Sequence, residues 1–428
     1  MNVTILAIGS RGDAHPYVAL GVGLRRAGHA VRFVTTTDFT HLAREHGLDV
    51  EPVPFSVQAA LAERSAQRAV EGGGHRASFS AFARIARSGA RALARTALTA
   101  TDGADVLVGG LSAIAVGTAV ATRTGVPFVP ALNVPVDATA AWPGVLFPNL
   151  RIGSHAWSNR TSHRLTHLAL WLTVRAGADA ARVEVLGMPP LPRFGGLARL
   201  LPSELPVLYG ISSAILPTPA DWPATRHVVG TWFLDPPPLW RPDAELEAFL
   251  AAGAAPVYIG FGSMGADDPA ATARLVLDAI HEAGLRAIVH RGWARLLDGE
   301  APAHVHAVES VPHGWLLPRV AAAVHHGGAG TTAASLRAGL PTVVVPFHGD
   351  QPFWARRVRD LGAGPTPIPR RRLDAGRLAT ALVEATSDPS LRRRASELGA
   401  QIRAEDGVGD AVRWLERTVA GGRADDAP

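Results

Sequence analysis

Residues 324–351 read VHHGGAGTTAASLRAGLPTVVVPFHGDQ, and this stretch decides the fold. The apolar run just before it, 321–324, predicts a short strand that ends at a pair of histidines. A glycine-rich turn follows, and then a predicted helix, Ala333–Ala338, which Gly339 caps. Thr342–Pro346 predicts a buried strand of a parallel sheet. A strand, a glycine-rich turn, a helix and a second strand form one Rossmann-like βαβ unit.

The glycine-rich turn predicts a binding site for an anion. Gly328 and Gly330 let the backbone approach a ligand, and Thr331 falls where unpaired N–H groups and the helix dipole favour a phosphate. Asp350 and Gln351 follow the second strand, at the edge where open α/β sheets bind ligands. The alternative is an ordinary βαβ unit whose glycines serve only packing. A diphosphate on the helix and hydroxyl groups at the Asp-Gln pair would together indicate a nucleotide-sugar.

Two segments of this stretch resemble a known family. HHGGAGTT (325–332) and GDQPFWARRV (349–358) are similar to the donor-binding signature of family 1 nucleotide-sugar glycosyltransferases of the GT-B type. The likeness is greatest to the branch of sterol-glucosyltransferase-like and antibiotic (macrolide, glycopeptide) glycosyltransferases, and it spans most of the chain. It implies an α/β fold with two Rossmann-like domains facing a central cleft. It also implies a C-terminal helix that crosses back to the N-terminal domain.

The composition agrees with a two-domain protein. The chain has 428 residues, of which 47% are hydrophobic and 18% charged, and this length suggests two domains. No apolar run is long enough to predict a transmembrane helix. The N-terminal MNVTILAIGS predicts a strand and a loop, so we expect no signal peptide there. The absence of cysteine excludes disulfides and thiolate metal sites and favours a cytoplasmic location.

The positive charge comes from arginine alone. The formal net charge is +5, and the sequence contains no lysine. The arginines are spread along the chain without a basic patch interleaved with aromatic residues, so we expect no nucleic-acid partner. Arg84, Arg87, Arg91 and Arg95 share one helix face, which predicts a solvated basic face. A peripheral contact with anionic lipid headgroups is the alternative. Both a monomer and a homodimer fit the sequence.

The chain order predicts four segments. An N-terminal, acceptor-binding Rossmann-like domain covers 1–214, and a proline-punctuated linker covers 215–240. A donor-binding Rossmann-like domain covers 241–405, and a crossover helix with a disordered tail covers 406–428. The DWP and GTWF pieces inside the linker resemble the sterol-glucosyltransferase-like branch.

Glycosyl transfer requires a base for the acceptor hydroxyl and stabilisation of the departing diphosphate. The segment GSRGDAHP (9–16) follows the first strand and precedes a helix that Pro16 is predicted to open. The resemblance places the catalytic base at Asp13, and His15 is the rival. The other interpretation is that both side chains only cap the helix.

The resemblance also assigns the donor phosphates. His326 would contact the α-phosphate, while Gly328, Gly330 and Thr331 would hold the β-phosphate. Ser263, in the turn GFGSM after another predicted strand, would donate to the diphosphate from a second side. His325 is predicted to be a strand-end residue and not a ligand.

The resemblance assigns the base and the sugar to other residues. Trp293, in a Gly-Trp pair, would stack on the nucleobase, and Val311 would contact it through its backbone. Plant members of the family carry a stacking tryptophan where this chain has Ser310, so uracil and thymine remain open. Asp350 and Gln351 would hold sugar hydroxyls, which favours glucose.

The acceptor is predicted to be lipophilic, with aromatic side chains lining its site: Trp142, Phe147, Trp157 and Trp171. The resemblance therefore implies an inverting hexosyltransferase. It would move a hexose, in the first place glucose, from UDP- or TDP-glucose to a sterol, a macrolide, another polyketide or a similar natural product, without a metal or a further cofactor. The alternatives are a GT-B nucleotide-sugar epimerase and a non-catalytic protein that binds a nucleotide-sugar or a lipid.

Overall fold

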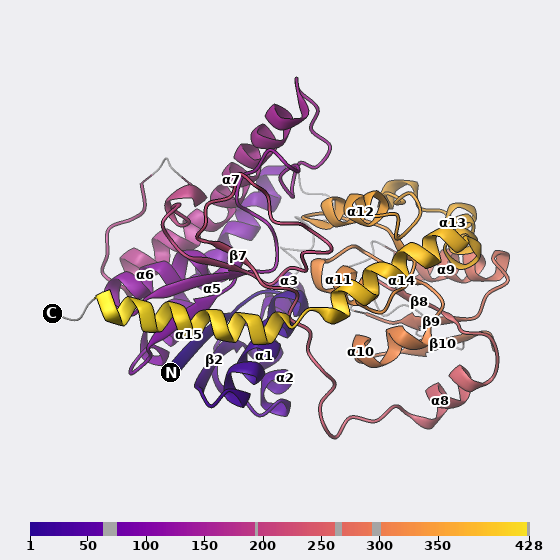
Figure 1. Ribbon diagram of the computed structural model, residues 1–428, viewed down its shortest axis with the longest axis horizontal. Coiled ribbons are helices and arrows are strands. Elements are labelled where there is room, and N and C mark those ends of the chain that lie inside the picture. Colours follow the sequence, from indigo (N-terminus) through magenta and orange to yellow (C-terminus); the bar gives the residue numbers. More distant parts are fainter. Residues whose placement is uncertain (63–74, 193–195, 262–267, 293–300, 426–428) are drawn as a thin grey trace. The chain divides into compact units, whose positions relative to one another are not determined.

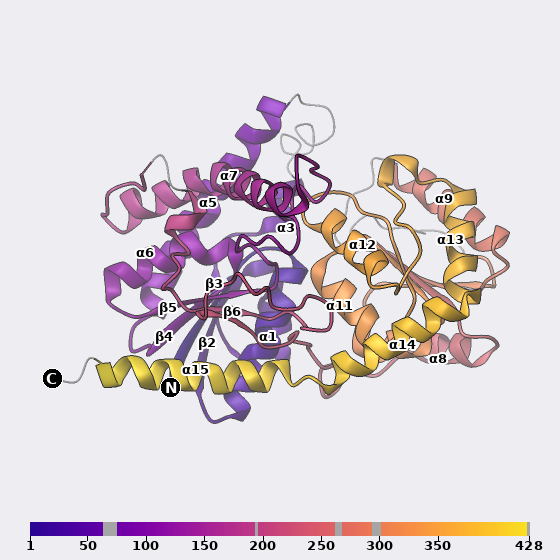
Figure 2. The same ribbon diagram turned by 45° about the horizontal axis from the view of Figure 1, so that its top comes forward.

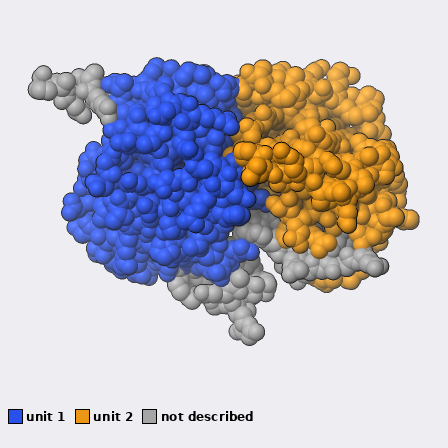
Figure 3. Space-filling model, turned by 90° about the horizontal axis from the view of Figure 1, so that it is seen from below, with its two compact units in different colours: residues 1–211, 218–232, 406–428 blue, residues 212–217, 233–405 orange. Residues whose placement is uncertain are grey.

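A computed structural model describes residues 1–62, 75–192, 196–261, 268–292 and 301–425. The chain divides into two compact units, which Figure 3 distinguishes by colour. Unit 1 contains residues 1–211, 218–232 and 406–428, and unit 2 contains residues 212–217 and 233–405.

Unit 1 is built on a seven-stranded parallel sheet. The strands are β1 (Asn2–Ala7), β2 (Ala30–Thr36), β3 (Asp49–Val53), β4 (Val106–Gly109), β5 (Phe128–Leu132), β6 (Val207–Tyr209) and β7 (Arg226–Val228). Their order is β3-β2-β1-β4-β5-β6-β7, so the direction of winding reverses between β1 and β4. Open α/β sheets bind ligands at such a switch point, beyond the carboxyl ends of the strands. The loop that leads from β1 to Asp13 starts there.

The helices of unit 1 connect these strands. They are α1 (Arg11–Arg26), α2 (Thr40–Glu45), α3 (Val57–Ala62), α5 (His75–Ala100), α6 (Ile114–Thr124), α7 (His155–Ala180) and α15 (Gly407–Asp425), with the short turns η1 (Thr37–Phe39), η2 (Leu111–Ala113), η3 (Ala181–Val185) and η4 (Leu197–Arg199). The two long helices α5 and α7 pack side by side (Figures 1 and 2). None of the described helices is long and apolar enough to cross a membrane.

The first helix begins earlier than the sequence predicts. Pro16 was expected to open it, but α1 starts at Arg11 and Pro16 lies inside it. Ser10 is the N-cap, and its carbonyl accepts hydrogen bonds from the N–H groups of Asp13 and Ala14. Pro16 lies in the second turn and lacks the N–H that would bond to the Gly12 carbonyl, so the helix forgoes one hydrogen bond there. The shift places Asp13 in the first turn.

The segment predicted to be a linker, 215–240, contains β7. This strand pairs in parallel with β6 and forms the edge of the sheet of unit 1. It has three residues, Arg226–Val228, among prolines and tryptophans. Pairing with β6 stabilises this strand, and the local hydrophobic pattern does not predict it.

The C-terminal helix α15 belongs to unit 1, as the predicted crossover requires (Figure 1). It packs on α1, where a Cβ on Gly23 would overlap the side chain of Val408. The helix is also held by His29, whose Nε2 lies 2.9 Å from a carboxylate oxygen of Glu416. Glycine at position 23 therefore sets how closely the two helices approach.

Unit 2 is built on a five-stranded parallel sheet. Its strands are β8 (Val257–Gly260), β9 (Ala287–His290), β10 (Val305–Val308), β11 (Ala323–His325) and β12 (Thr342–Val344), in the order β10-β9-β8-β11-β12. Its helices are α8 (Ala244–Ala251), α9 (Pro269–Glu282), α10 (His313–Leu316), α11 (Ala329–Arg337), α12 (Gln351–Asp360), α13 (Ala375–Ser387) and α14 (Pro389–Ala404), with the turns η5 (Leu317–Arg319) and η6 (Arg370–Arg372). Two parallel-sheet α/β units confirm the predicted fold class.

Helix α11 also begins earlier than predicted, at Ala329 and not at Ala333. Gly328 is its N-cap, and the Thr332 N–H already donates to the Gly328 carbonyl. The prediction placed the start too late because glycine and threonine have low helix propensity, which argued against a helix that begins within Gly-Ala-Gly-Thr-Thr. The consequence is that Gly330 and Thr331 belong to the first helical turn.

Candidate active site

Asp13 lies at the carboxyl edge of the unit 1 sheet, just after β1. Its Oδ2 accepts hydrogen bonds from the Ser10 N–H at 2.8 Å and from the Ser10 hydroxyl at 2.9 Å. The carboxylate therefore helps to cap α1, as the alternative interpretation supposed. Both hydrogen bonds from Ser10 reach Oδ2, which leaves Oδ1 to accept a proton from a ligand. Sequence reasoning missed Ser10, although the spacing Ser-x-x-Asp is a signal of such a cap.

The surroundings of Asp13 favour its protonated form. Burial raises the pKa of Asp13 above its ordinary value, and the hydrogen bonds from Ser10 only partly oppose this rise. Gly9 has a φ of +140°, and a Cβ there would overlap the Asp13 carboxylate. Tyr17, one turn further along α1, donates its hydroxyl proton to the Ala131 carbonyl at the end of β5. A carboxylate with a raised pKa is a stronger base once it is ionised.

The rival base, His15, has a different neighbour. Its Nε2 lies 2.9 Å from Nε of Arg11, one turn earlier on α1. Its side chain is half-buried. The two candidates thus lie on one helix turn but take different hydrogen bonds.

The two histidines after β11 have different environments. His325 is fully buried; its Nδ1 accepts from the Gly327 N–H at 3.0 Å, and its Nε2 lies 3.2 Å from the Ser335 hydroxyl. These contacts fix the strand end, where the sequence predicted His325 to lie. His326 is half-buried, and its Nδ1 is buried with no hydrogen-bond partner among the described residues.

His326 is neutral at physiological pH. Its pKa is lowered to about 4, chiefly by burial and also by the nearby His348, while a hydrogen bond to the Gly260 backbone acts in the opposite direction. Gly328 must lack a side chain, because a Cβ there would lie 2.6 Å from Nε2 of His326. The ring is thus held between the end of β8 and the start of α11.

The N-terminus of α11 has backbone donors to spare. Its N-cap is a glycine, which has no side chain to accept a hydrogen bond from the first turn. Gly330 is exposed, Thr331 is half-buried, and the buried hydroxyl of Thr332 has no partner among the described residues. Gly327 makes the turn with a φ of +91°, and a Cβ on it would lie 2.7 Å from Val344 Cγ1. The free N–H groups and the helix dipole favour an anion at this end.

Asp350 and Gln351 follow β12. Asp350 is the N-cap of α12, and Gln351 is the first residue of that helix. Oδ2 of Asp350 accepts from the Trp354 indole N–H at 2.8 Å. The side-chain oxygen of Gln351 accepts from the N–H groups of Phe347 and His348, at 2.8 and 3.1 Å. Gln351 is only 5% exposed, so it shapes the loop as well as facing the sheet edge. The side chain of Asp350 is half-buried beside this loop.

Two predicted donor residues, Ser263 and Trp293, lie outside the described residues. Val311 is half-buried, and its side chain packs against a core cluster that contains Leu316 and Tyr258. Its side chain therefore serves packing, and the contact of its backbone with the nucleobase stays a prediction.

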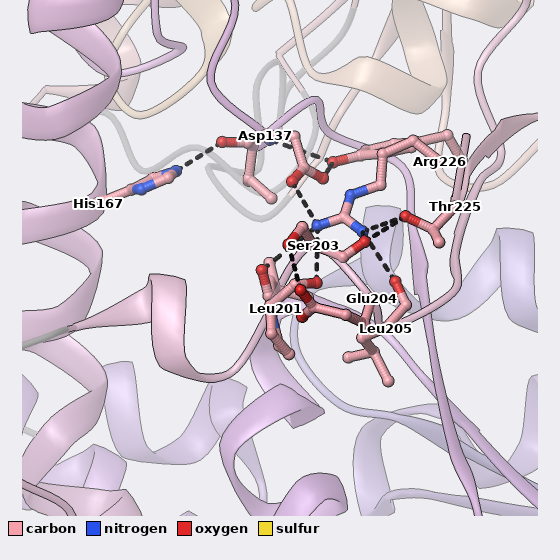
Figure 4. A network of polar contacts seen from close by, with 11 residues as sticks. Asp137, His167, Leu201, Ser203, Glu204, Leu205, Thr225 and Arg226 are labelled. Carbon is pink, nitrogen blue, oxygen red and sulfur yellow. Dashed lines mark hydrogen bonds and ion pairs between the residues drawn. The ribbon is translucent and has the colours of Figure 1, made fainter. Parts of the chain in front are cut away.

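The loop that carries Trp142 and Phe147 is anchored by a buried ion pair (Figure 4). A guanidinium nitrogen of Arg226 lies 2.9 Å from Oδ1 of Asp137, and the Arg226 side chain is only 2% exposed. Tyr209 donates its hydroxyl proton to Oδ2 of Asp137 at 2.6 Å. The two terminal nitrogens of Arg226 also donate to backbone carbonyls of Leu201, Pro202, Ser203 and Leu205, while the buried Nε has no partner among the described residues. Sequence reasoning missed this network because its members lie far apart in the chain, at residues 137, 201–209 and 226.

The four predicted acceptor aromatics lie in different environments. Trp142 is half-buried and packs edge-on against Trp222, with ring centroids 5.8 Å apart. Trp171 is 4% exposed and belongs to the core of unit 1, so it offers no surface in this structure. Phe147 and Trp157 are 37% and 52% exposed.

An apolar cavity of about 220 Å³ lies in unit 1, at the carboxyl end of β4. It is lined by Leu111, Ser112, Ile114, Ala115, Leu170, Thr173, Val174, Leu197 and Leu200. None of the four predicted aromatics lines it. No regular spacing of residues in the sequence could predict this cavity, because its lining comes from η2, α6, α7 and the end of η4.

Comparison with known families matches both ends of the chain. Residues 3–130 match the glycosyltransferase family 28 N-terminal domain. Residues 274–416 match the C-terminal domain of erythromycin biosynthesis protein CIII-like proteins.

Curated relatives align along nearly the whole chain. The sterol 3-beta-glucosyltransferase of Emericella nidulans is 35% identical over 434 residues, which cover 98% of this chain. That of Candida albicans is 35% identical over 428 residues, covering 97%. The chain spans only 30% and 27% of the length of these two relatives.

Solved structures show the same fold. The glycosyltransferase of kitacinnamycin superposes with a TM-score of 0.70 at 20% identity, over 98% of this chain and 99% of that one. Glycosyltransferase VinC, solved in complex with DTDP, gives 0.67 at 22% identity, over 98% and 100%. Two parallel-sheet units of this type define the GT-B class. Within it, the chain belongs to the glycosyltransferases that combine a family 28 N-terminal domain with an EryCIII-like C-terminal domain.

Proposed function

We propose that this chain is an inverting glycosyltransferase that moves a hexose, glucose in the first place, from a UDP- or TDP-sugar to a hydroxyl of a lipophilic acceptor. Unit 2 would bind the donor and unit 1 the acceptor. The observation that carries the proposal is the start of α11, where free N–H groups lie beside the unpaired Nδ1 of His326.

The donor half of the proposal follows from charge. A nucleoside diphosphate is an anion, and a helix N-terminus capped by glycine offers it hydrogen bonds and a favourable dipole. Gly330 and Thr331 would bind one phosphate, and His326 the other. The carboxylate of Asp350 would accept hydrogen bonds from sugar hydroxyls. As the bond to the anomeric carbon breaks, these donors would stabilise the charge that develops on the leaving diphosphate.

The acceptor half rests on Asp13. Its Oδ1 would take the proton of the acceptor hydroxyl while that oxygen bonds to the anomeric carbon and the diphosphate leaves from the opposite face. Configuration at the anomeric carbon is then inverted. The raised pKa of Asp13 suits a general base, and Ser10 would hold the carboxylate in one orientation.

The relatives support the substrate classes. Two similar proteins carry the name sterol 3-beta-glucosyltransferase, which favours glucose and a sterol-like acceptor. VinC and SsfS6, similar in fold, were solved with thymidine diphosphate. A sterol, a macrolide or another polyketide therefore belongs in the first acceptor panel.

The test is a mass-spectrometric assay of the purified chain with UDP-glucose and TDP-glucose and a panel of sterol, macrolide and flavonoid acceptors. We expect a hexose adduct that disappears in Asp13→Asn, which keeps the shape and the hydrogen bond from the Ser10 N–H. His15→Gln is the matched variant on the same helix turn and should retain activity. Loss of activity in His15→Gln alone would make His15 the base. Nucleotide binding without any adduct across the panel would instead support a non-catalytic binding protein.

A further inference from the structure

The outer face of α7 is unusually apolar for a surface helix. Trp157, Leu165, Leu168 and Leu172 are all exposed, and Leu168 and Leu172 retain 53% and 49% of their accessible surface. Their spacing of three, four and eight residues places them on one face. Six of the nine large apolar side chains that are exposed in the described residues lie between residues 147 and 172. Such concentration marks an interaction surface, whereas single exposed apolar residues do not.

The same face is cationic. Arg160 and Arg164 are exposed beside the apolar residues, and Arg151 and His155 lie just before them. The sequence has no aspartate or glutamate from residue 138 to residue 178. The acidic groups that do approach are paired: Asp179 lies 3.4 Å from Arg175, and Asp221 lies 3.4 Å from Arg160. Arg151 and Arg164 thus add positive charge beside the apolar face, whereas the charge of Arg160 is partly offset by Asp221.

We propose that the exposed face of α7, made of Trp157, Leu165, Leu168 and Leu172 with Arg160 and Arg164, binds a membrane surface that contains anionic phospholipids. A helix with leucine and tryptophan on one face and arginine beside them lies in the headgroup region, where the apolar side chains enter the acyl boundary. The arginines then contact lipid phosphates, each contributing about 1 kcal/mol near the surface.

The inner side of α7 adjoins an apolar cavity, which connects the proposed membrane contact with a lipophilic ligand. On its inner side, Leu170, Thr173 and Val174 of α7 line the apolar cavity at the end of β4. One helix therefore presents apolar surface outward and encloses apolar space inward. In this respect the inference rests on the proposed function, because a lipophilic acceptor dissolves in a membrane. The binding itself does not depend on transfer and can be tested without it.

Two alternatives fit less well: a second copy of the chain on this face, and lipid contact through α5 instead of α7. A second copy docked by the same face would bring Arg160 and Arg164 of both copies together across a two-fold axis, which like charges disfavour. The basic face of α5 is the other candidate surface for lipid contact. Among the side chains that the structure describes there, no large apolar one is exposed, and Arg91 lies 2.7 Å from Glu184. Arg91, with Arg87 and Arg95 nearby, holds the pKa of Glu184 below its usual range.

The test is co-sedimentation with extruded vesicles of phosphatidylcholine alone and of phosphatidylcholine with phosphatidylglycerol. The variant Leu168→Gln/Leu172→Gln removes half-exposed side chains from the face, and Leu239→Gln is the matched control, because Leu239 is 91% exposed far from α7 in sequence. We expect the unmodified chain and the control to bind the anionic vesicles, and binding of the double variant to fall on the order of tenfold. Arg164→Glu should weaken binding to anionic vesicles and leave binding to neutral ones unchanged.

Equal binding by the double variant and the control would overturn the proposal. It would also be overturned if analytical ultracentrifugation showed a dimer of the unmodified chain that the double variant lost, because the face would then pair two copies. Calorimetric binding of UDP or TDP should be the same in all variants, which shows that they are folded. Vesicle binding without any hexose transfer would sustain this inference while the proposed function failed.

Discussion

His326 should take up a proton when a nucleoside diphosphate binds. Its pKa is lowered to about 4 by burial, so at pH 7 the ring is neutral. A neutral ring that donates one N–H to the Gly260 backbone has only a lone pair at the other nitrogen, and a lone pair repels a phosphate oxygen. Protonation at pH 7 costs about 4 kcal/mol for a group of this pKa, which the phosphate charges must offset. Binding should therefore be coupled to proton uptake and become tighter as the pH falls.

Isothermal titration calorimetry with UDP and TDP, in two buffers of different ionisation enthalpy, measures this uptake. We expect an uptake near one proton for the unmodified chain at about pH 7, and a smaller one for His326→Gln, with affinity lowered by about tenfold or more. His163→Gln is the matched control, since burial lowers the pKa of His163 also to about 4, but His163 lies on α7 in unit 1. Equal proton uptake in the unmodified chain and His326→Gln would refute the reasoning.

Three further predictions concern unit 1. Burial raises the pKa of Asp13 above its ordinary value of 3.8, so the base ionises at a higher pH than an exposed aspartate; kcat/KM should fall on the acid side with an inflection above 3.8, and a profile flat to pH 4 would contradict this. Gly23→Ala should destabilise the chain because its Cβ would overlap Val408, by about 1–3 kcal/mol, whereas Gly12→Ala on the same helix should be neutral or stabilising in thermal unfolding. Arg226→Met strands a carboxylate and several carbonyls, so urea unfolding should show a loss of about 3–5 kcal/mol, and a loss below about 1 kcal/mol would show that water replaces the guanidinium.

The sequence was most informative where chemistry and local pattern coincide. The run from 324 to 351 predicted the order strand, turn, helix and strand, and the structure shows β11, α11 and β12 in that order. Glycine at 328 and 330 requires no tertiary context to indicate close approach by a ligand. The carboxyl edge that holds this turn also follows from the parallel βαβ pattern.

Local pattern misplaced the helix starts because boundaries depend on caps and not on periodicity. Proline is favoured at the first helical position, and this preference suggested a start at Pro16. In the structure α1 instead begins at Arg11. The Ser10 N–H donates to the Asp13 carboxylate, and the Asp13 N–H donates to the Ser10 carbonyl. The same reciprocity gives Asp13 its orientation, which no count of hydrophobic residues could supply.

Sequence by itself determined the class of this protein, because short-range patterns of glycine, apolar and polar residues fix βαβ units within about 30 residues. Tertiary structure alone decided which polar groups are buried together. Arg226 and Asp137 are separated by 89 positions, yet their ion pair holds the loop of Trp142. The apolar cavity and the outward face of α7 likewise arise from helices that meet only on folding. Burial and long-range pairing depend on the whole fold, and these decide the pKa of His326 and the surface that α7 leaves exposed.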